Sequence, residues 1–292
     1  MAQATGTLRS ADGTVSGKVL ILRHSRAVRI LHWVNFITLT IMLMSGLQIF
    51  NAHPALYWGK TSDFARPALS IGAMEDDKGH TWGVTTVGSH SFVTTGVLGW
   101  SKDSDGTYQV RAFPTWATLP GETWLAMGRA WHFFFAWIFV LNGALYVLLG
   151  ILSGHLRRDL WPTRIDWKRL GHTFIEHARL RFPKGDEARR YNGIQKLAYL
   201  SVIFIVGPLI VLTGLTMSPT IDAGWPWLLA IFGGRQSART IHFICAMALL
   251  AFFLVHIIMV ILSGTWNNLR SMISGRYAIE TAPSGAGNEP HE

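Results

Sequence analysis

Four long apolar stretches without Asp, Glu, Lys or Arg constrain this chain more than any other feature. They cover residues 30–50, 130–154, 197–221 and 240–264. About 20 apolar residues are enough to cross a bilayer as an α-helix, and only 15% of the chain is charged, against roughly a quarter in soluble domains. The sequence therefore predicts an all-α integral membrane protein, a bundle of four transmembrane helices at about residues 28–50, 130–154, 197–218 and 240–264.

The distribution of basic residues predicts the orientation of the bundle. Residues 155–195 contain ten Lys and Arg residues, whereas residues 219–238 contain only Arg235. Because short loops rich in Lys and Arg stay in the cytoplasm, we expect residues 155–195 to form a cytoplasmic loop. Both termini, residues 1–27 and 265–292, are then cytoplasmic as well. The formal net charge of +9 is explained by membrane topology, and no nucleic-acid partner is expected.

The connection formed by residues 51–123 lies on the periplasmic side in this orientation. It is longer than a simple link between two helices needs to be, and it contains four Trp residues. Within it, the charge-free stretch 79–101 is rich in Gly, Thr and Ser, which favours short strands and turns. We expect residues 51–123 to fold as a small cap that either shields the bundle or provides a docking surface for another protein.

Four histidines inside the predicted spans are the candidate cofactor ligands, because ionisable residues in a membrane span are functional hypotheses by default. His132 and His242 fall near the periplasmic ends of their spans, and His32 and His256 fall nearer the cytoplasm. The two histidines of the fourth span are about 21 Å apart along one side of an α-helix. Two facing imidazoles at each level match the axial ligands of a haem iron. With Cys245 as its one cysteine, the chain cannot attach haem through a C-x-x-C-H motif.

Small and basic residues accompany these histidines. Gly46 and Gly143 could provide room for a porphyrin beside a helix, although Gly is also common at ordinary contacts between membrane helices. Arginines lie three or six residues before the histidines of the spans, and Arg side chains match carboxylates. The candidates for pairing with haem propionates, or alternatively with lipid phosphates, are Arg26, Arg29, Arg129 and Arg239.

The segments around the histidines resemble a known family. They are RILHW, GRAWHFFFAWIFVLNG and RTIHFICAMALLAFFLVH. They resemble the bacterial and nickel-hydrogenase b-type cytochromes, also called the prokaryotic cytochrome b561 family, and the resemblance covers about residues 23–276. It implies a cytochrome b domain at residues 28–264 in the bacterial inner membrane. It also implies two haem b groups, one held by His32 and His256 and the other by His132 and His242, and electron transfer between a membrane quinone and a redox partner.

Three further segments narrow the resemblance. NAHPALYWG, PTWATLPGETWLAMGRAWHFFFAW and GHLRRDLWP are most similar to members associated with periplasmic molybdopterin oxidoreductases. This similarity implies an electron-transfer subunit of a respiratory complex, with a molybdopterin-containing partner docked on residues 51–123. The candidate quinone-site residues near the cytoplasmic face are His24, His155, Gln195 and Lys196, and Gln48 marks an alternative site near the periplasm.

Two other functions fit parts of the sequence. A self-contained cytochrome would reduce quinone with a small donor such as superoxide and would need no further subunit. A transporter would use the intramembrane histidines to move protons or metal ions. That function would more naturally use carboxylates within the membrane, and all four predicted spans lack them.

Overall fold

The computed structural model describes residues 4–9, 15–168, 170–171 and 193–280. Within this part of the chain, four helical segments are long and apolar enough to cross a membrane. They are α1 (Arg26–Asn51), α2 (Leu125–Leu152), the segment Gly193–Leu215 and α8 (Arg235–Leu262). Each coincides with one of the charge-free stretches, so the chain is a multi-pass membrane protein. The middle of the basic loop 155–195 and the tail from residue 281 lie outside the described residues.

The chain divides into two compact units. The cap-side unit contains Val34–Leu145 and Ser201–Ala251, and the terminal unit contains Met1–Trp33, Tyr146–Leu200 and Phe252–Glu292. All four spans contribute residues to both units. His132 and His242 belong to the cap-side unit, and His32 and His256 belong to the terminal unit.

The third span is not a regular α-helix throughout. α4 (Gly193–Ser201) is followed by the π-helical turn η4 (Val202–Val206), and α5 (Gly207–Leu215) follows that turn. Pro208 lies near the start of α5. Because proline has no backbone N–H and its ring collides with the preceding turn of a helix, a wider π-helical turn at this point has a clear local cause.

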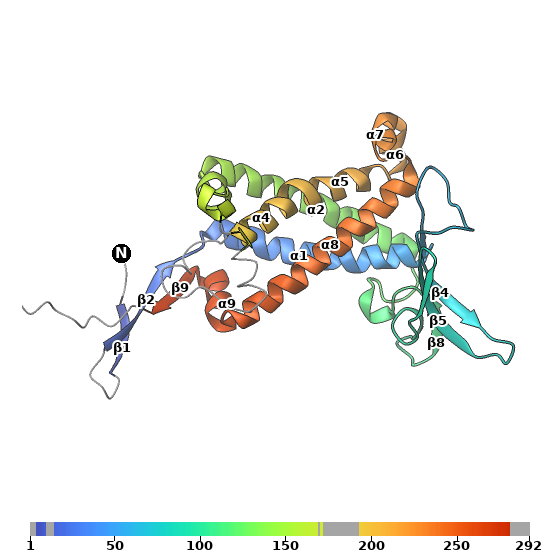
Figure 1. Cartoon of the computed structure of the whole chain (residues 1–292), viewed down its shortest axis with the longest axis horizontal. Helices are drawn as coiled ribbons and strands as arrows, with labels where there is room; N and C mark the ends of the chain where they lie inside the picture. Colours follow the sequence, from blue (N-terminus) through green and yellow to red (C-terminus); the bar gives the residue numbers. More distant parts are fainter. Residues whose placement is uncertain (1–3, 10–14, 169, 172–192, 281–292) are drawn as a thin grey trace, which may run out of the picture. The chain divides into compact units, whose positions relative to one another are not determined.

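Residues 51–123 of the cap-side unit fold mainly as β-structure. β3 (Ala55–Leu56), β4 (Leu69–Glu75), β5 (Thr81–Val87) and β6 (His90–Val93) form an antiparallel sheet in that order, and β7 (Gly99–Lys102) pairs with β8 (Tyr108–Arg111). Figure 1 shows strands of this cap beside the C-terminal end of α1. The strands predicted within residues 79–101 are present. The all-α prediction holds for the spans, and the β-structure is in the cap, where the Gly, Thr and Ser pattern favoured strands.

The cap has a small hydrophobic core that continues into the spans. Phe50, Leu56, Ile71 and Ala112 are buried together, and Phe243 of α8 packs against them. Gly99 has a φ of 79°, and a Cβ at this position would collide with the carbonyl oxygen of Gly72. Glycine at this position therefore allows β7 to approach β4 closely.

The start of α8 is hydrogen-bonded to the first part of the cap. The Thr240 hydroxyl donates to the carbonyl oxygen of Tyr57 at 2.6 Å, and the backbone N–H of Gly59 donates to the Ser237 hydroxyl at 2.7 Å. Three short helices complete this unit, and prolines at or before their first residues favour helix initiation. They are η1 (Thr115–Ala117), α6 (Pro219–Gly224) and α7 (Pro226–Ile231).

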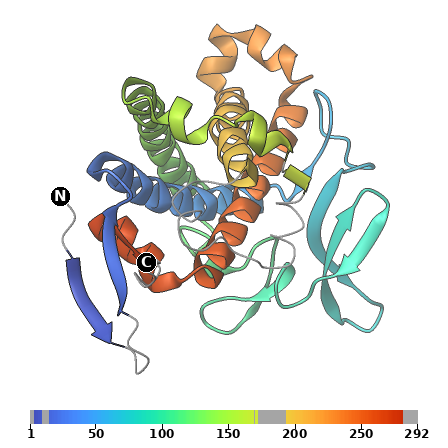
Figure 2. The same cartoon turned by 60° about the vertical axis from the view of Figure 1, so that its left-hand side comes forward.

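The terminal unit brings the two ends of the chain together. β1 (Ala4–Arg9), β2 (Val15–Leu22) and β9 (Arg276–Glu280) form an antiparallel sheet in the order β1-β2-β9, of which Figure 2 shows β1 and β2 in blue. α9 (Thr265–Ser274) precedes β9, and the Trp33 indole of α1 donates to the Met272 carbonyl at 3.2 Å. Backbone pairing of β2 with β9 therefore joins described parts of the two predicted terminal segments. This unit also contains the π-helical turn η2 (Leu156–Leu160), just after α2.

Candidate functional site

In the cap-side unit, His132 of α2 faces His242 of α8. Their ring centroids are 6.2 Å apart, and the ring planes are inclined by 62°. Metal–nitrogen bonds of imidazole are about 2.0–2.1 Å long, so this separation is compatible with one metal ion between the two rings. The sequence predicts this pairing, because both residues lie near the periplasmic ends of their predicted spans.

Both imidazoles of this pair are held through Nδ1. Nδ1 of His132 lies 3.1 Å from the Ser45 hydroxyl and 3.1 Å from the carbonyl oxygen of Met42, both on α1. Nδ1 of His242 lies 3.3 Å from the Thr213 hydroxyl and 2.9 Å from the carbonyl oxygen of Ile210. Hydrogen bonds at one ring nitrogen leave the other, Nε2, free to bind a metal.

In the terminal unit, His32 of α1 faces His256 of α8. Their ring centroids are 6.3 Å apart with an interplanar angle of 57°. Phe252, one helical turn before His256, stacks on its ring at 6.2 Å, and Trp33 meets His32 edge-on at 5.5 Å. Nδ1 of His32 is buried and has no hydrogen-bond partner within the described residues.

The donor sets of both pairs fit a haem better than a bare metal ion. Among the described residues, no group of three or more His, Cys, Asp or Glu side chains could hold a metal ion. A six-coordinate haem iron takes only two ligands from the protein, because the porphyrin supplies the other four. Each unit provides two facing imidazoles, beside small residues in the cap-side unit and aromatic residues in the terminal unit.

The two candidate glycines lie in different surroundings. A Cβ at Gly46 would be 3.3 Å from Cε1 of His132, so this glycine lets α1 approach that imidazole closely. Gly143 is exposed, and a Cβ there would meet nothing within 4 Å in the described structure. Gly214 was not identified from the sequence. A Cβ at this position would be 3.2 Å from Cε1 of His242, so it corresponds to Gly46.

The four candidate arginines make different contacts. Arg239 donates to the backbone carbonyl oxygens of Ala55, at 2.7 Å, and of His53, so a propionate would have to displace contacts with the cap. Arg129 is exposed and lies over the Phe133 ring, while Arg29 donates to the carbonyl oxygen of Ile273. Arg26 is exposed at the first residue of α1.

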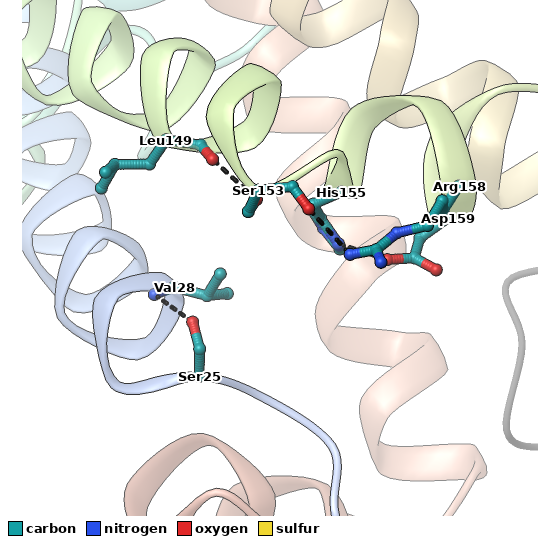
Figure 3. Close-up of polar contacts among 7 residues, drawn as sticks. All are labelled: Ser25, Val28, Leu149, Ser153, His155, Arg158 and Asp159. Atoms are coloured by element: carbon teal, nitrogen blue, oxygen red, sulfur yellow. Dashed lines mark hydrogen bonds and ion pairs between the residues drawn. The ribbon is translucent and has the colours of Figure 1, made fainter.

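The two candidate quinone-site histidines, His24 and His155, lie close enough in the terminal unit for the charge of His155 to affect the pKa of His24. Burial, followed by the nearby charges of Arg23, His32 and His155, lowers the pKa of His24 to about 4. Nδ1 of His155 lies 2.6 Å from a carboxylate oxygen of Asp159, one helical turn further along the chain, as Figure 3 shows. Asp159 was not identified from the sequence, although its spacing from His155 is that of neighbours on a helix face.

Lys196, Gln195 and Gln48 have other surroundings. The Lys196 ammonium group is buried and lies 2.9 Å from the Asp166 carboxylate. Burial raises the pKa of Asp166, but hydrogen bonds from Lys196 and Thr163 outweigh this effect, and the pKa is lowered. Gln195 is half-buried beside Lys196 on α4. Gln48 is 2% exposed, accepts a hydrogen bond from Arg111 at 3.1 Å and donates to the Glu122 carbonyl at 2.7 Å, so it is part of the seam between α1 and the cap.

Comparison with known proteins shows the family to which the chain belongs. The sequence matches the family described as prokaryotic cytochrome b561 over residues 23–275. The chain belongs to this family, and it is therefore a membrane cytochrome b, for which the family implies haem b. A protein of Azospira oryzae named "Putative protein-methionine-sulfoxide reductase subunit YedZ1" is 33% identical over 149 residues, which are 51% of this chain and 71% of that protein. No solved structure shows a significant match.

Proposed function

We propose that this protein is a di-haem cytochrome b that carries electrons between membrane quinone and a periplasmic, molybdopterin-containing redox partner. The observation that carries the proposal is the presence of two facing histidine pairs, His132 with His242 and His32 with His256, one in each unit. Haem b supplies one-electron chemistry when it is bound. The protein supplies the axial ligands, their orientation and an apolar surrounding that sets the redox potential.

The class of partner is supported by two observations. The sequence segments in the cap and in the second span resemble members associated with molybdopterin oxidoreductases, and the relative from Azospira oryzae is named as a subunit of a protein-methionine-sulfoxide reductase. A reductase consumes electrons. The direction that this relative supports is therefore from quinol to the partner.

The cap is the proposed docking surface. It exposes several large apolar side chains, which monomeric proteins rarely gather in one region without an interaction to serve. The most exposed are Phe64, Trp116, Val93, Val110 and Trp58. The basic loop 155–195 supports the orientation in which this cap faces the periplasm and both termini face the cytoplasm. The bacterial inner membrane is the proposed location.

Quinone exchange is proposed for the terminal unit, near His32 and His256. Oxidation of a quinol releases two electrons and two protons, so the site needs groups that accept protons as the electrons leave. The contacting pair of His155 and Asp159 provides such groups, and His24 is the neighbouring candidate residue. The buried pair of Lys196 and Asp166 is better explained as an anchor for the start of α4.

A difference spectrum of dithionite-reduced minus air-oxidised protein, with pyridine haemochrome quantification, tests the proposal. We expect two b-type haems per chain, and we expect His242→Ala and His256→Ala each to lose one. Unchanged stoichiometry in either variant would exclude that ligand assignment. Reduction by superoxide, followed by quinone reduction in the absence of a second protein, would favour the self-contained cytochrome. Protein without haem, produced with an ample haem supply, would contradict the cytochrome assignment.

A further inference from the structure

We propose that Ser45 and Thr213 are positioning residues that orient His132 and His242 and lower the redox potential of the haem between them. This inference rests on the proposed ligand assignment. It goes further by assigning a role to two hydroxyl groups on helices that carry neither ligand of this pair.

The hydroxyl groups accept hydrogen bonds from the imidazoles. The Ser45 hydroxyl proton is directed to backbone carbonyls, with Oγ 2.7 Å from the Ile41 oxygen. The Thr213 hydroxyl is likewise directed to the Leu209 oxygen at 2.7 Å. Each hydroxyl has one proton to donate, so its oxygen is left to accept a hydrogen bond from Nδ1 of the facing histidine.

The carbonyl contacts fix the tautomer. A carbonyl oxygen only accepts, and Nδ1 of His132 and of His242 each lies within 3.1 Å of one, from Met42 and Ile210 respectively. Nδ1 therefore carries the proton in both rings, and Nε2 presents its lone pair on the opposite side. The hydroxyl and the carbonyl share one N–H group, and together they restrict rotation of the ring.

The arrangement occurs twice, on different spans. Residues 42–47 have the sequence MLMSGL, and residues 210–215 have the sequence IVLTGL. In both, the carbonyl that accepts from Nδ1 comes three residues before the hydroxyl, and the glycine that contacts Cε1 follows the hydroxyl directly. An incidental contact would not be expected to recur with the same two offsets. The repetition indicates a built support for each ligand of this pair.

The other histidine pair lacks this support on at least one side, because the buried Nδ1 of His32 has no hydrogen-bond partner within the described residues. An imidazole whose N–H donates to an acceptor is a more basic ligand. A more basic ligand stabilises the more positively charged, oxidised iron. The hydroxyl groups therefore lower the potential of the haem in the cap-side unit, and they help to make the two haems unequal.

The test compares hydroxyl deletion with hydroxyl retention in the full-length, haem-loaded protein. Ser45→Ala, Thr213→Val and the double variant remove the acceptors, and Thr213→Ser retains one. Thr40→Val is the matched control, because Thr40 is on α1 and its hydroxyl donates to the Phe36 carbonyl at 2.8 Å, as in an ordinary membrane helix. The readouts are haem per chain, the midpoint potential of each haem and the low-spin EPR signal, which reports on ligand orientation.

We expect a more positive potential for one haem and a shifted EPR signal in the deletion variants, with the largest change in the double variant. Thr213→Ser and Thr40→Val should resemble the parent. Loss of one haem on hydroxyl deletion, with retention in Thr213→Ser, would equally support a positioning role. The inference would be overturned if the double variant retained both haems with unchanged potentials and EPR signals. Retention of both haems in His132→Ala would instead refute the ligand assignment on which it rests.

Discussion

Gly46 lies so close to His132 that a Cβ at this position would be 3.3 Å from Cε1 of the imidazole. Gly214 has the same relation to His242, at 3.2 Å. Both separations are tighter than ordinary van der Waals contact, so either the side chain or the helix would have to move to admit even a methyl group. The absence of a side chain at these two positions is therefore part of how the imidazoles are placed.

Branched side chains at these glycines should displace the imidazoles. We expect Gly46→Val and Gly214→Val each to reduce the haem content from about two per chain to about one, because each ligand would be pushed from its position. The pyridine haemochrome assay measures this. Gly143→Ala is the control, since a Cβ there meets nothing within 4 Å in the described structure. Full haem content in both valine variants would show that these close contacts do not matter.

The sequence predicted the residues that the structure brings face to face, but not their support. The depth of a histidine in its span follows from chain direction and helical rise, so His132 with His242 and His32 with His256 could be paired without coordinates. Ser45 and Thr213 could not be found in this way. A hydroxyl in a membrane helix is usually explained by a bond to its own backbone, and the second bond depends on how two helices pack.

Contacts between distant parts of the sequence account for the other differences. Lys196 was interpreted as a candidate quinone-site residue because Asp166, its partner 2.9 Å away, lies 30 positions earlier in the sequence. Arg239 was interpreted as a possible ligand for propionates because its contacts with the backbone of His53 and Ala55 depend on the fold of the cap. The sheet β1-β2-β9 depends on pairing between the two ends of the chain.

Replacement of Arg239 distinguishes its two interpretations. Arg239→Gln removes charged donors from the carbonyl oxygens of His53 and Ala55. Hydrogen bonds from charged groups contribute about 1.5–3 kcal/mol each, so we expect a lower melting temperature and faster proteolysis of the cap, with haem content and potentials unchanged. The exposed Arg129 is the comparison, and Arg129→Gln should leave stability unchanged. A shifted haem potential in Arg239→Gln would favour the propionate role.

His24 should make stability depend on pH in a defined window. Burial and neighbouring positive charge lower its pKa from 6.5 to about 4 in the folded protein. Between these values the unfolded chain binds more protons than the folded chain at this site, so its contribution to stability is fully present above pH 6.5 and is lost as the pH falls toward 4. We expect His24→Gln to flatten the fall in melting temperature over this window. His90→Gln, in the exposed strand β6, should retain the slope, and an unchanged slope in His24→Gln would show that other groups cause it.

Cysteine labelling tests the orientation, because Cys245 is the one cysteine of the chain and is buried. In a Cys245→Ser background, the exposed residues Ser89 of the cap and Ser274 at the end of α9 are each replaced by cysteine. A membrane-impermeant maleimide should label Ser89→Cys in spheroplasts, and it should label Ser274→Cys only after the membrane is permeabilised. The basic residues of the loop 155–195 are the physical reason, since they resist translocation. The reverse pattern would place the cap in the cytoplasm and would move the proposed docking surface away from any periplasmic partner.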